Sequence, residues 1–210
     1  MYGEKERRSG CKISILNRKM PKEKETKETM TQEQQETIEA LIAQYPVCQY
    51  AFLKPADLTF PERVRQICES ECPRYGTTWA CPPGVGTVEE CRKECLEYED
   101  VILVTTLAEV EDTAILEETL KTREGHEEVI RALRKDLKEA GWQVLALSTE
   151  SCEICSKCAY PDAPCRFPEK MIPCVESYGI LVTDAAEKGG IDFFYDSNTV
   201  TWFGMLLIKK

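Results

Sequence analysis

Two groups of cysteines are the residues of this chain best suited to chemistry. In the late group, three cysteines follow one another with two residues between them, and a fourth lies farther along. Three thiolates on one short turn can bind three corners of a four-iron, four-sulfur cluster, and a fourth from farther along closes the shell. The late group is Cys152, Cys155, Cys158 and Cys165, and the early group is Cys68, Cys72 and Cys81.

Zinc is the alternative metal for the same thiolates. Zinc ribbons use paired Cys-x2-Cys turns that supply two ligands each, whereas the late group has a three-plus-one pattern that suits a four-iron cluster better. The only histidine, His126, is far from both groups in sequence, so we expect an ordinary helix residue at the edge of the core. Thiolate-rich sites accept either metal, so a [4Fe-4S] cluster is preferred and zinc stays open.

The early group lacks a fourth ligand. Cys91 and Cys95 share one face of a predicted helix with Val88, and cysteine is often buried without any ligand role. We therefore expect both to belong to the core. The fourth position of the early group can be filled by Cys91, by Cys174 or by a substrate.

The net charge of −10 excludes a nucleic-acid groove, because such a groove needs lysines and arginines to neutralise phosphates. Metal thiolate centres carry further negative charge, which Arg74 and Arg166 can offset. We expect Trp79, Tyr160 and Phe167 to pack around the centre and exclude water, not to stack on bases.

The beginning of the chain has no apolar run that resembles a secretory signal, and no segment is long and apolar enough to span a membrane. Cytoplasmic thiols are kept reduced unless they bind metal, so we expect a cytoplasmic protein whose 12 cysteines are not disulfides. Residues 1–30 are charged and without period, which predicts a disordered tail before a single domain over residues 31–210. Met20 and Met30 are candidate starts of translation.

The remaining sequence alternates between helical and strand patterns. Capping signals predict helices that begin at Thr31, Thr59 and Thr87. The expected strands are Val47–Leu53, Val101–Thr106, Trp142–Leu147, Phe193–Tyr195 and Val200–Ile208. The other expected helices are a long helical region from Thr113 to Ala140, in which Gly125 is a candidate break, a short helix near Pro168, and helical residues through Ala186.

This alternation predicts an α/β fold, with a mixed sheet of four to five strands covered by helices and with cysteine-rich metal-binding loops. Right-handed crossovers align at least the first three strands, and an antiparallel, ferredoxin-like α+β arrangement is the alternative. If the strands are parallel, the loop after Leu147 lies at a carboxyl edge, where α/β sheets place their sites.

The cysteines, prolines and aromatic residues together resemble the predicted metal-binding proteins described as domain of unknown function 2284. The resemblance covers nearly all of Val47–Ile208, and it implies metal binding by the seven cysteines of the two groups. Cys174 lies where relatives often carry serine, and Cys11, Cys48, Cys91 and Cys95 have no clear counterpart. The segments that carry it are Cys72–Pro83, Cys152–Pro161, Pro164–Pro168 and Val175–Gly179.

Three functions fit these observations. An iron–sulfur protein that relays electrons to a redox partner is preferred. An enzyme is the second, because a cluster held by three cysteines leaves one iron open as a Lewis acid for a small substrate, in a pocket shaped by Tyr75, Trp79 and residues 84–86. A structural zinc module is the third.

Overall fold

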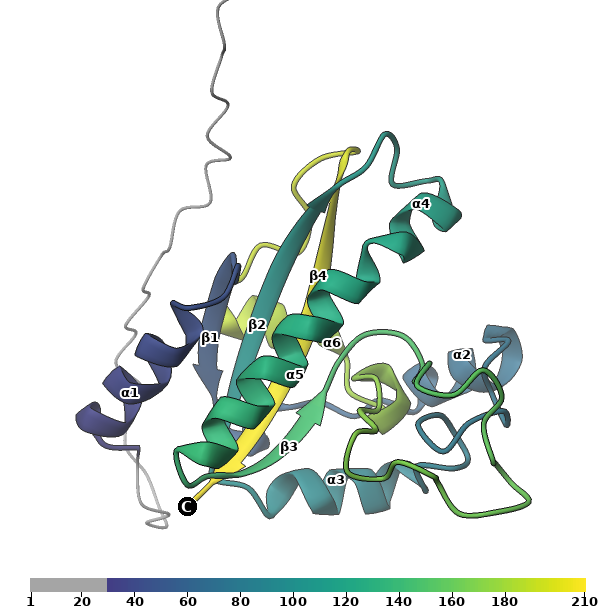
Figure 1. Ribbon diagram of the computed structural model, residues 1–210, viewed down its shortest axis with the longest axis horizontal. Coiled ribbons are helices and arrows are strands. Elements are labelled where there is room, and N and C mark those ends of the chain that lie inside the picture. Colours follow the sequence, from purple (N-terminus) through teal and green to yellow (C-terminus); the bar gives the residue numbers. More distant parts are fainter. Residues whose placement is uncertain (1–29) are drawn as a thin grey trace, which may run out of the picture.

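A four-stranded antiparallel sheet forms the centre of the molecule (Figure 1). The computed structural model describes residues 30–210, so the expected tail lies outside the described residues apart from Met30. Along the sheet the strand order is β1-β2-β4-β3. The strands are β1 (Gln49–Leu53), β2 (Asp100–Glu109), β3 (Gln143–Leu147) and β4 (Thr199–Lys209).

The direction of the strands follows from their connections. β2 and β3 run the same way, as their helical crossover predicts, and β4 lies between them antiparallel to both. β1 pairs antiparallel with β2, so the expected alignment of the first three strands is wrong for β1. The long chain from β1 to β2 turns back through two helices and a cysteine loop, and so does not form a crossover. The α/β layering is confirmed, with the antiparallel pairing that was the alternative.

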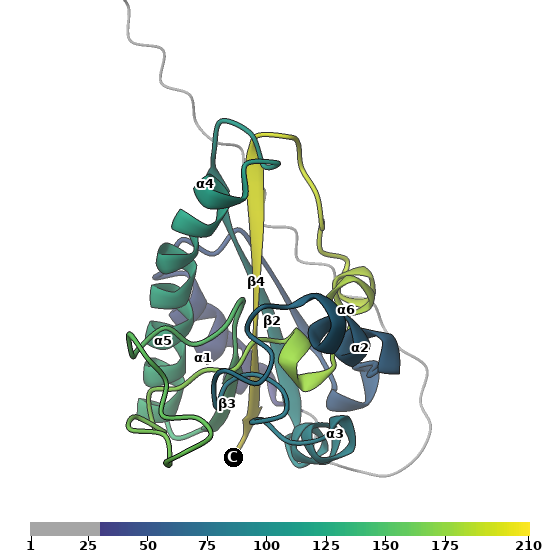
Figure 2. The same ribbon diagram turned by 90° about the vertical axis from the view of Figure 1, so that its right-hand side faces the viewer.

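Helices cover both faces of the sheet (Figure 2). On one face lie α1 and α5, and on the other lie α3, α6 and the short 3-10 helix η2, against which α2 packs. The bounds are α1 (Gln32–Ile42), α2 (Glu62–Glu71), α3 (Val88–Leu96), α4 (Leu116–Lys121), α5 (Arg123–Glu139), η2 (Glu176–Tyr178) and α6 (Val182–Gly189), with a further 3-10 turn, η1 (Pro55–Asp57).

Alternate residues of the central strands feed two separate apolar clusters. Leu103 and Met205 pack towards α6, whereas Ile102 and Leu206 pack towards α5, and all four are fully buried. Each such side chain contributes roughly 1.5–3 kcal/mol by leaving water. The sheet is therefore stabilised from both faces by apolar packing that includes none of the late cysteines.

Two of the three predicted helix caps are confirmed by the structure. Thr31 and Thr87 each form a capping box, as expected. Thr59 does not cap α2, which begins at Glu62 after Pro61; its hydroxyl instead donates to Asp184 Oδ2 at 2.8 Å. The Thr59 side chain thus joins the start of α2 to α6.

Three further expectations are wrong in detail. The helical region after β2 divides at Thr122, not at Gly125, which lies inside α5. The expected strand at Phe193–Tyr195 and the helix near Pro168 are irregular or turn segments. Phe193 stacks on Phe203 with ring centroids 5.0 Å apart, so packing onto β4 replaces strand pairing there.

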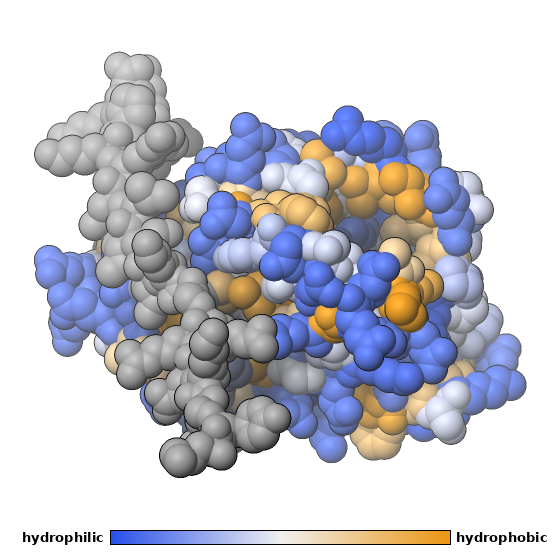
Figure 3. All heavy atoms as spheres, turned by 90° about the horizontal axis from the view of Figure 1, so that it is seen from above, coloured by the Kyte–Doolittle hydropathy of each residue, from blue (hydrophilic) through white to orange (hydrophobic). Residues whose placement is uncertain are grey.

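Among residues 30–210, none of the helices combines the length and apolar character needed to cross a membrane. On the face seen from above, apolar patches are set among charged side chains (Figure 3). Large exposed apolar residues include Ile115, Leu116, Phe193 and Phe194.

Candidate metal centre

The early group lies where α2 ends. Cys68 is in the last turns of α2, Cys72 is its C-cap, and Cys81 follows in an irregular loop. All three line one cavity of about 220 Å³, and Cys174 lines it as well. The loops that carry the two cysteine groups lie together beside α2, at one end of the sheet (Figure 1). The structure thus brings a fourth thiol to the early group from a distant part of the chain.

Tight turns hold Cys81 in place. The Gly76 N–H donates to the Pro82 carbonyl at 2.7 Å, and the Val85 N–H donates to the Cys81 carbonyl at 3.2 Å. A Cβ at Gly84 would lie 2.7 Å from the Thr78 carbonyl oxygen, closer than real contacts allow. The loop therefore needs glycine at that position to keep Cys81 facing the cavity.

Cys174 is positioned by the sheet. It forms an isolated parallel bridge with Ser148, the residue that follows β3. Its sulfur accepts a hydrogen bond from the Ser177 N–H at 3.2 Å. N–H donors to sulfur are common around metal thiolates, where they stabilise the negative charge.

Burial controls the acidity of these thiols. It raises the pKa of Cys68, and the neighbouring Cys72 thiolate raises it further. Burial also raises the pKa of Cys174 well above its usual range, as does the nearby Glu176 carboxyl, whose own pKa burial raises. Without metal, Cys68 and Cys174 are thiols at neutral pH. Metal binding here must therefore release protons.

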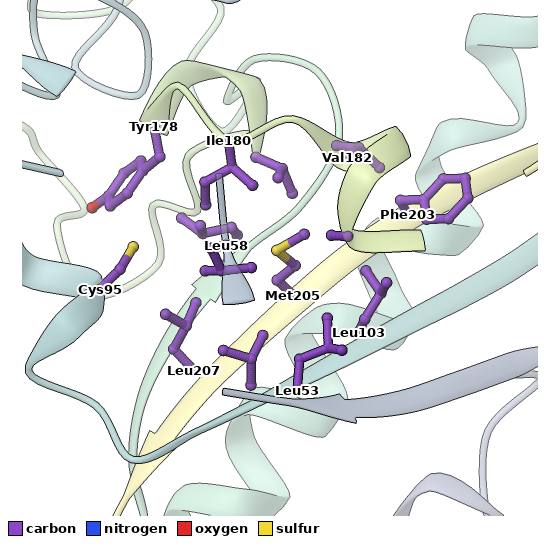
Figure 4. Packing of buried hydrophobic residues seen from close by; sticks show 14 of the residues in the cluster. Leu53, Leu58, Cys95, Leu103, Tyr178, Ile180, Val182, Phe203, Met205 and Leu207 are labelled. Atoms are coloured by element: carbon purple, nitrogen blue, oxygen red, sulfur yellow. The ribbon is translucent and has the colours of Figure 1, made fainter. Parts of the chain in front are cut away.

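Cys91 and Cys95 belong to the core, as expected from their helical spacing. Both are buried in the apolar cluster that includes Tyr178, and neither lines the cavity of the early group. Figure 4 shows Cys95 and Tyr178 in this cluster. Burial raises the pKa of Cys95 to about 12. The Cys91 sulfur faces the Val85 carbonyl oxygen at 3.5 Å and Arg65 Nη2 at 3.9 Å.

The late group occupies the loop that leaves β3. Its four cysteines, together with Trp79 and Phe167, line a narrow cavity of about 20 Å³. Three of the four also line an open cavity of about 590 Å³. A volume of 20 Å³ holds about one water molecule, so a cluster enters this group only if the loop widens.

Aromatic and basic residues surround the late group. Trp79 and Tyr160 meet edge to face with ring centroids 4.9 Å apart, and Trp79 Nε1 donates to the Ala163 carbonyl at 2.9 Å. Arg166 donates to the Lys157 carbonyl at 2.8 Å, which joins two points within the loop. These contacts give Trp79 and Tyr160 the packing role expected for them.

Two side chains connect the groups. The Ser151 hydroxyl lies 3.1 Å from the Cys81 sulfur and 3.2 Å from Thr78 Oγ1. Arg74 lines both the early cavity and the open late cavity, and it pairs with Glu153. The cation expected to offset metal-centre charge thus lies between the two groups.

The donor atoms of both groups are thiols, which suit soft metals such as iron in sulfide clusters, or zinc. Within the described part of the chain, no three Cys, His, Asp or Glu side chains converge closely enough to hold one ion. The sulfur atoms surround cavities instead, so binding any metal requires side-chain rotation. The early cavity is larger than the narrow late cavity, but smaller than the open cavity that three of the late cysteines line.

Sequence reasoning missed two residues of this region and left a third undecided. It gave no role to Ser151 or Glu176, which are brought to the cavity by long-range contacts, and it left Cys174 as one candidate of three. Proximity of Ser151 to Cys152 in sequence was the only available signal. The expectation that no cysteine forms a disulfide is wrong for Cys48, which is disulfide-bonded, whereas the other ten described cysteines are free.

Comparison with known proteins gives one match. Searches of curated proteins and of solved structures found none. The family model described as "Predicted metal-binding protein (DUF2284)" matches residues 51–208, which include both cysteine groups and Cys174. The chain therefore belongs to this family of predicted metal-binding proteins.

Proposed function

We propose that the chain is an iron–sulfur protein that transfers electrons. The late group holds one [4Fe-4S] cluster, and the early group takes part in a second. The observation that carries this proposal is that each cysteine group lines its own cavity, and that the two cavities adjoin through Arg74. When bound, such clusters accept and give up one electron at a time.

The residues around the sulfur atoms support this role. Trp79, Tyr160 and Phe167 limit the access of water to the late group. The Ser177 N–H donates to the Cys174 sulfur, while the Ser151 hydroxyl accepts from the Cys81 thiol. Exposure and hydrogen bonding to the sulfurs are the features by which proteins set cluster potentials. Arg74 supplies positive charge between the two groups.

A redox protein is the partner that this function requires. Because the chain carries a net charge of −10, a partner with a basic docking surface is favoured and nucleic acid is not. A reducing compartment such as the cytoplasm suits the proposal, since free thiols must stay reduced until they are metallated.

Metal analysis of the protein purified without oxygen tests the proposal. We expect about eight iron and about eight sulfide per chain, with an electron paramagnetic resonance signal that appears on dithionite reduction. Stoichiometric zinc without iron or sulfide would overturn the proposal in favour of the structural zinc module.

A matched pair of variants assigns the late cluster. Cys155→Ser is expected to lose about four iron per chain, whereas Ser156→Ala, the exposed neighbour, is expected to keep all of them. Equal iron content in the two variants would show that Cys155 binds no cluster.

A further inference from the structure

We infer that Cys174 is the fourth thiolate of the early metal centre, which makes it a closed four-cysteine site with Cys68, Cys72 and Cys81. The inference rests on the proposed function for the identity of the metal. The choice of Cys174 rests on the arrangement of the residues alone.

Cys174 lies at the same cavity as the early cysteines. Cys174 and the three early cysteines line the same cavity of about 220 Å³. They reach it from separate elements: the end of α2, the loop after it, and the bridge beside β3. A cubic cluster needs ligands from several directions, and Cys174 comes from a different part of the chain than the other three cysteines.

The second argument is that Cys174 is held in place. Backbone bonds on both sides fix its segment: Ser148 N–H donates to the Pro173 carbonyl, and Val175 N–H donates to the Ser148 carbonyl, each at 2.9 Å. The Ser177 N–H points at its sulfur. A fixed ligand with a donor already aimed at it loses little conformational freedom on binding metal.

Cys91, the other cysteine that could be the fourth ligand, is held in the core. Cys91 is 1% exposed and lines none of the cavities that contain the early cysteines. Its sulfur is enclosed by the Val85 carbonyl and by Arg65, whose guanidinium donates to the Gly86 and Ser177 carbonyls at 2.8 and 2.7 Å. Reaching the cavity would require Cys91 to leave the core and displace that arginine.

A closed site has a functional consequence. With four thiolates, no iron of the early centre is left open to bind a substrate, so the centre transfers electrons and does not act as a Lewis acid. A closed early site therefore favours an electron carrier over the enzyme that was the alternative function.

The first test compares Cys174→Ser with Cys91→Ser in the full chain, purified without oxygen. We expect Cys174→Ser to lose between one and four iron per chain and to change the resonance signal of the early centre. Cys91→Ser should keep both. Full iron and an unchanged signal in Cys174→Ser would overturn the inference, as would loss of iron in Cys91→Ser with an intact Cys174→Ser.

The second test does not depend on iron. In the full chain with all four late cysteines changed to serine, Co²⁺ bound to the early site reports its thiolates through the intensity of the sulfur-to-cobalt charge-transfer band. Adding Cys174→Ser is expected to lower that band by about a quarter, the share of one ligand in four. An unchanged band would overturn the inference.

The two tests distinguish failure of the proposed function from failure of the inference about Cys174. Zinc in place of iron would overturn the proposed function, but the cobalt band would still decide the role of Cys174. Far-UV circular dichroism checks that each variant is folded. If Cys174→Ser is unfolded, Cys174→Ala replaces it in both tests, because alanine leaves no unpaired hydroxyl at this buried position.

Discussion

Ser148 and Cys174 lie side by side in a parallel bridge, so the long loop that carries the late cysteines begins and ends at the same point of the fold. The two backbone hydrogen bonds of this bridge close the loop without help from a metal. The loop is thus an excursion from the sheet, and its conformation can change while the sheet stays intact.

Removal of metal is expected to loosen this loop and to spare the sheet. The two apolar clusters on the sheet contain none of the late cysteines, so they remain packed in the metal-free protein. We expect limited proteolysis to cut within residues 152–168 after chelation, with little change in far-UV circular dichroism. Global unfolding on chelation would contradict this prediction.

Replacement of Ser151 by alanine is expected to lower the reduction potential of the early centre. The Ser151 hydroxyl lies 3.1 Å from the Cys81 sulfur and accepts from its thiol. Once metal replaces the thiol proton, the hydroxyl is free to donate to the sulfur, and such a bond is strongest in the reduced, more negative state. Such a bond contributes about 1 kcal/mol, which corresponds to about 40 mV for one electron. Potentiometric titration measures the shift.

Ser148→Ala is the control for Ser151. The Ser148 hydroxyl is also buried, and within the described residues it has no hydrogen-bond partner. Its removal should leave the potential unchanged. Equal potentials in the Ser151 and Ser148 variants would mean that the Ser151 hydroxyl does not donate to Cys81.

Arg65→Met is expected to reduce the free energy of unfolding by about 2 kcal/mol. The guanidinium joins the loop at Gly86 to the segment at Ser177, and a hydrogen bond from a charged group contributes about 1.5–3 kcal/mol. Arg65→Lys should recover only part of the loss, because one ammonium replaces a planar fork. Urea denaturation measures both, and full recovery by lysine would refute the bridging role.

Stability should fall between about pH 6.5 and pH 4 because of His126. Its side chain is 1% exposed, its Nδ1 lies 2.9 Å from Thr106 Oγ1, and burial lowers its pKa from 6.5 to about 4. In this interval the unfolded state binds a proton that the folded state does not. Stability is therefore lost as the pH falls, by up to about 3 kcal/mol in all, and His126 contributes no pH dependence above the interval.

The measurement for His126 is urea denaturation of the metal-free protein at pH 7 and pH 4.5. His126→Gln should lose the part of the pH dependence that belongs to this residue, while the cysteines contribute equally to both proteins. The same loss of stability in both proteins would show that His126 does not titrate on unfolding.

Local signals in the sequence predicted much of the fold. Thr31 and Thr87 identify their helices through capping, and the apolar run from Val101 identifies β2, which is buried on both faces. The strand order could not be predicted, because the insertion of β4 between β2 and β3 depends on long-range packing. The aromatic run at Phe193 imitates a strand, yet its ring packs on Phe203 instead.

The candidate site also has a part that local spacing predicts and a part that only long-range contacts create. The spacing of Cys152, Cys155 and Cys158 is local and places them in one loop, as the sequence predicted. The approach of Cys174 to Cys81 is created by the bridge at Ser148, and nothing in the spacing of the cysteines records it. The group that looked incomplete in the sequence therefore has four thiols at its cavity.

Ser151 lies against Cys81, and the next residue in the chain, Cys152, belongs to the other group. One peptide bond therefore separates the surroundings of the two groups, and each of the proposed clusters would gain negative charge on reduction. Salt screens the repulsion between charges only weakly when they lie within a Debye length of each other. For the two clusters that we propose, an electron on one would oppose an electron on the other, so we expect two electrons to be taken up at two separate potentials that belong to the pair.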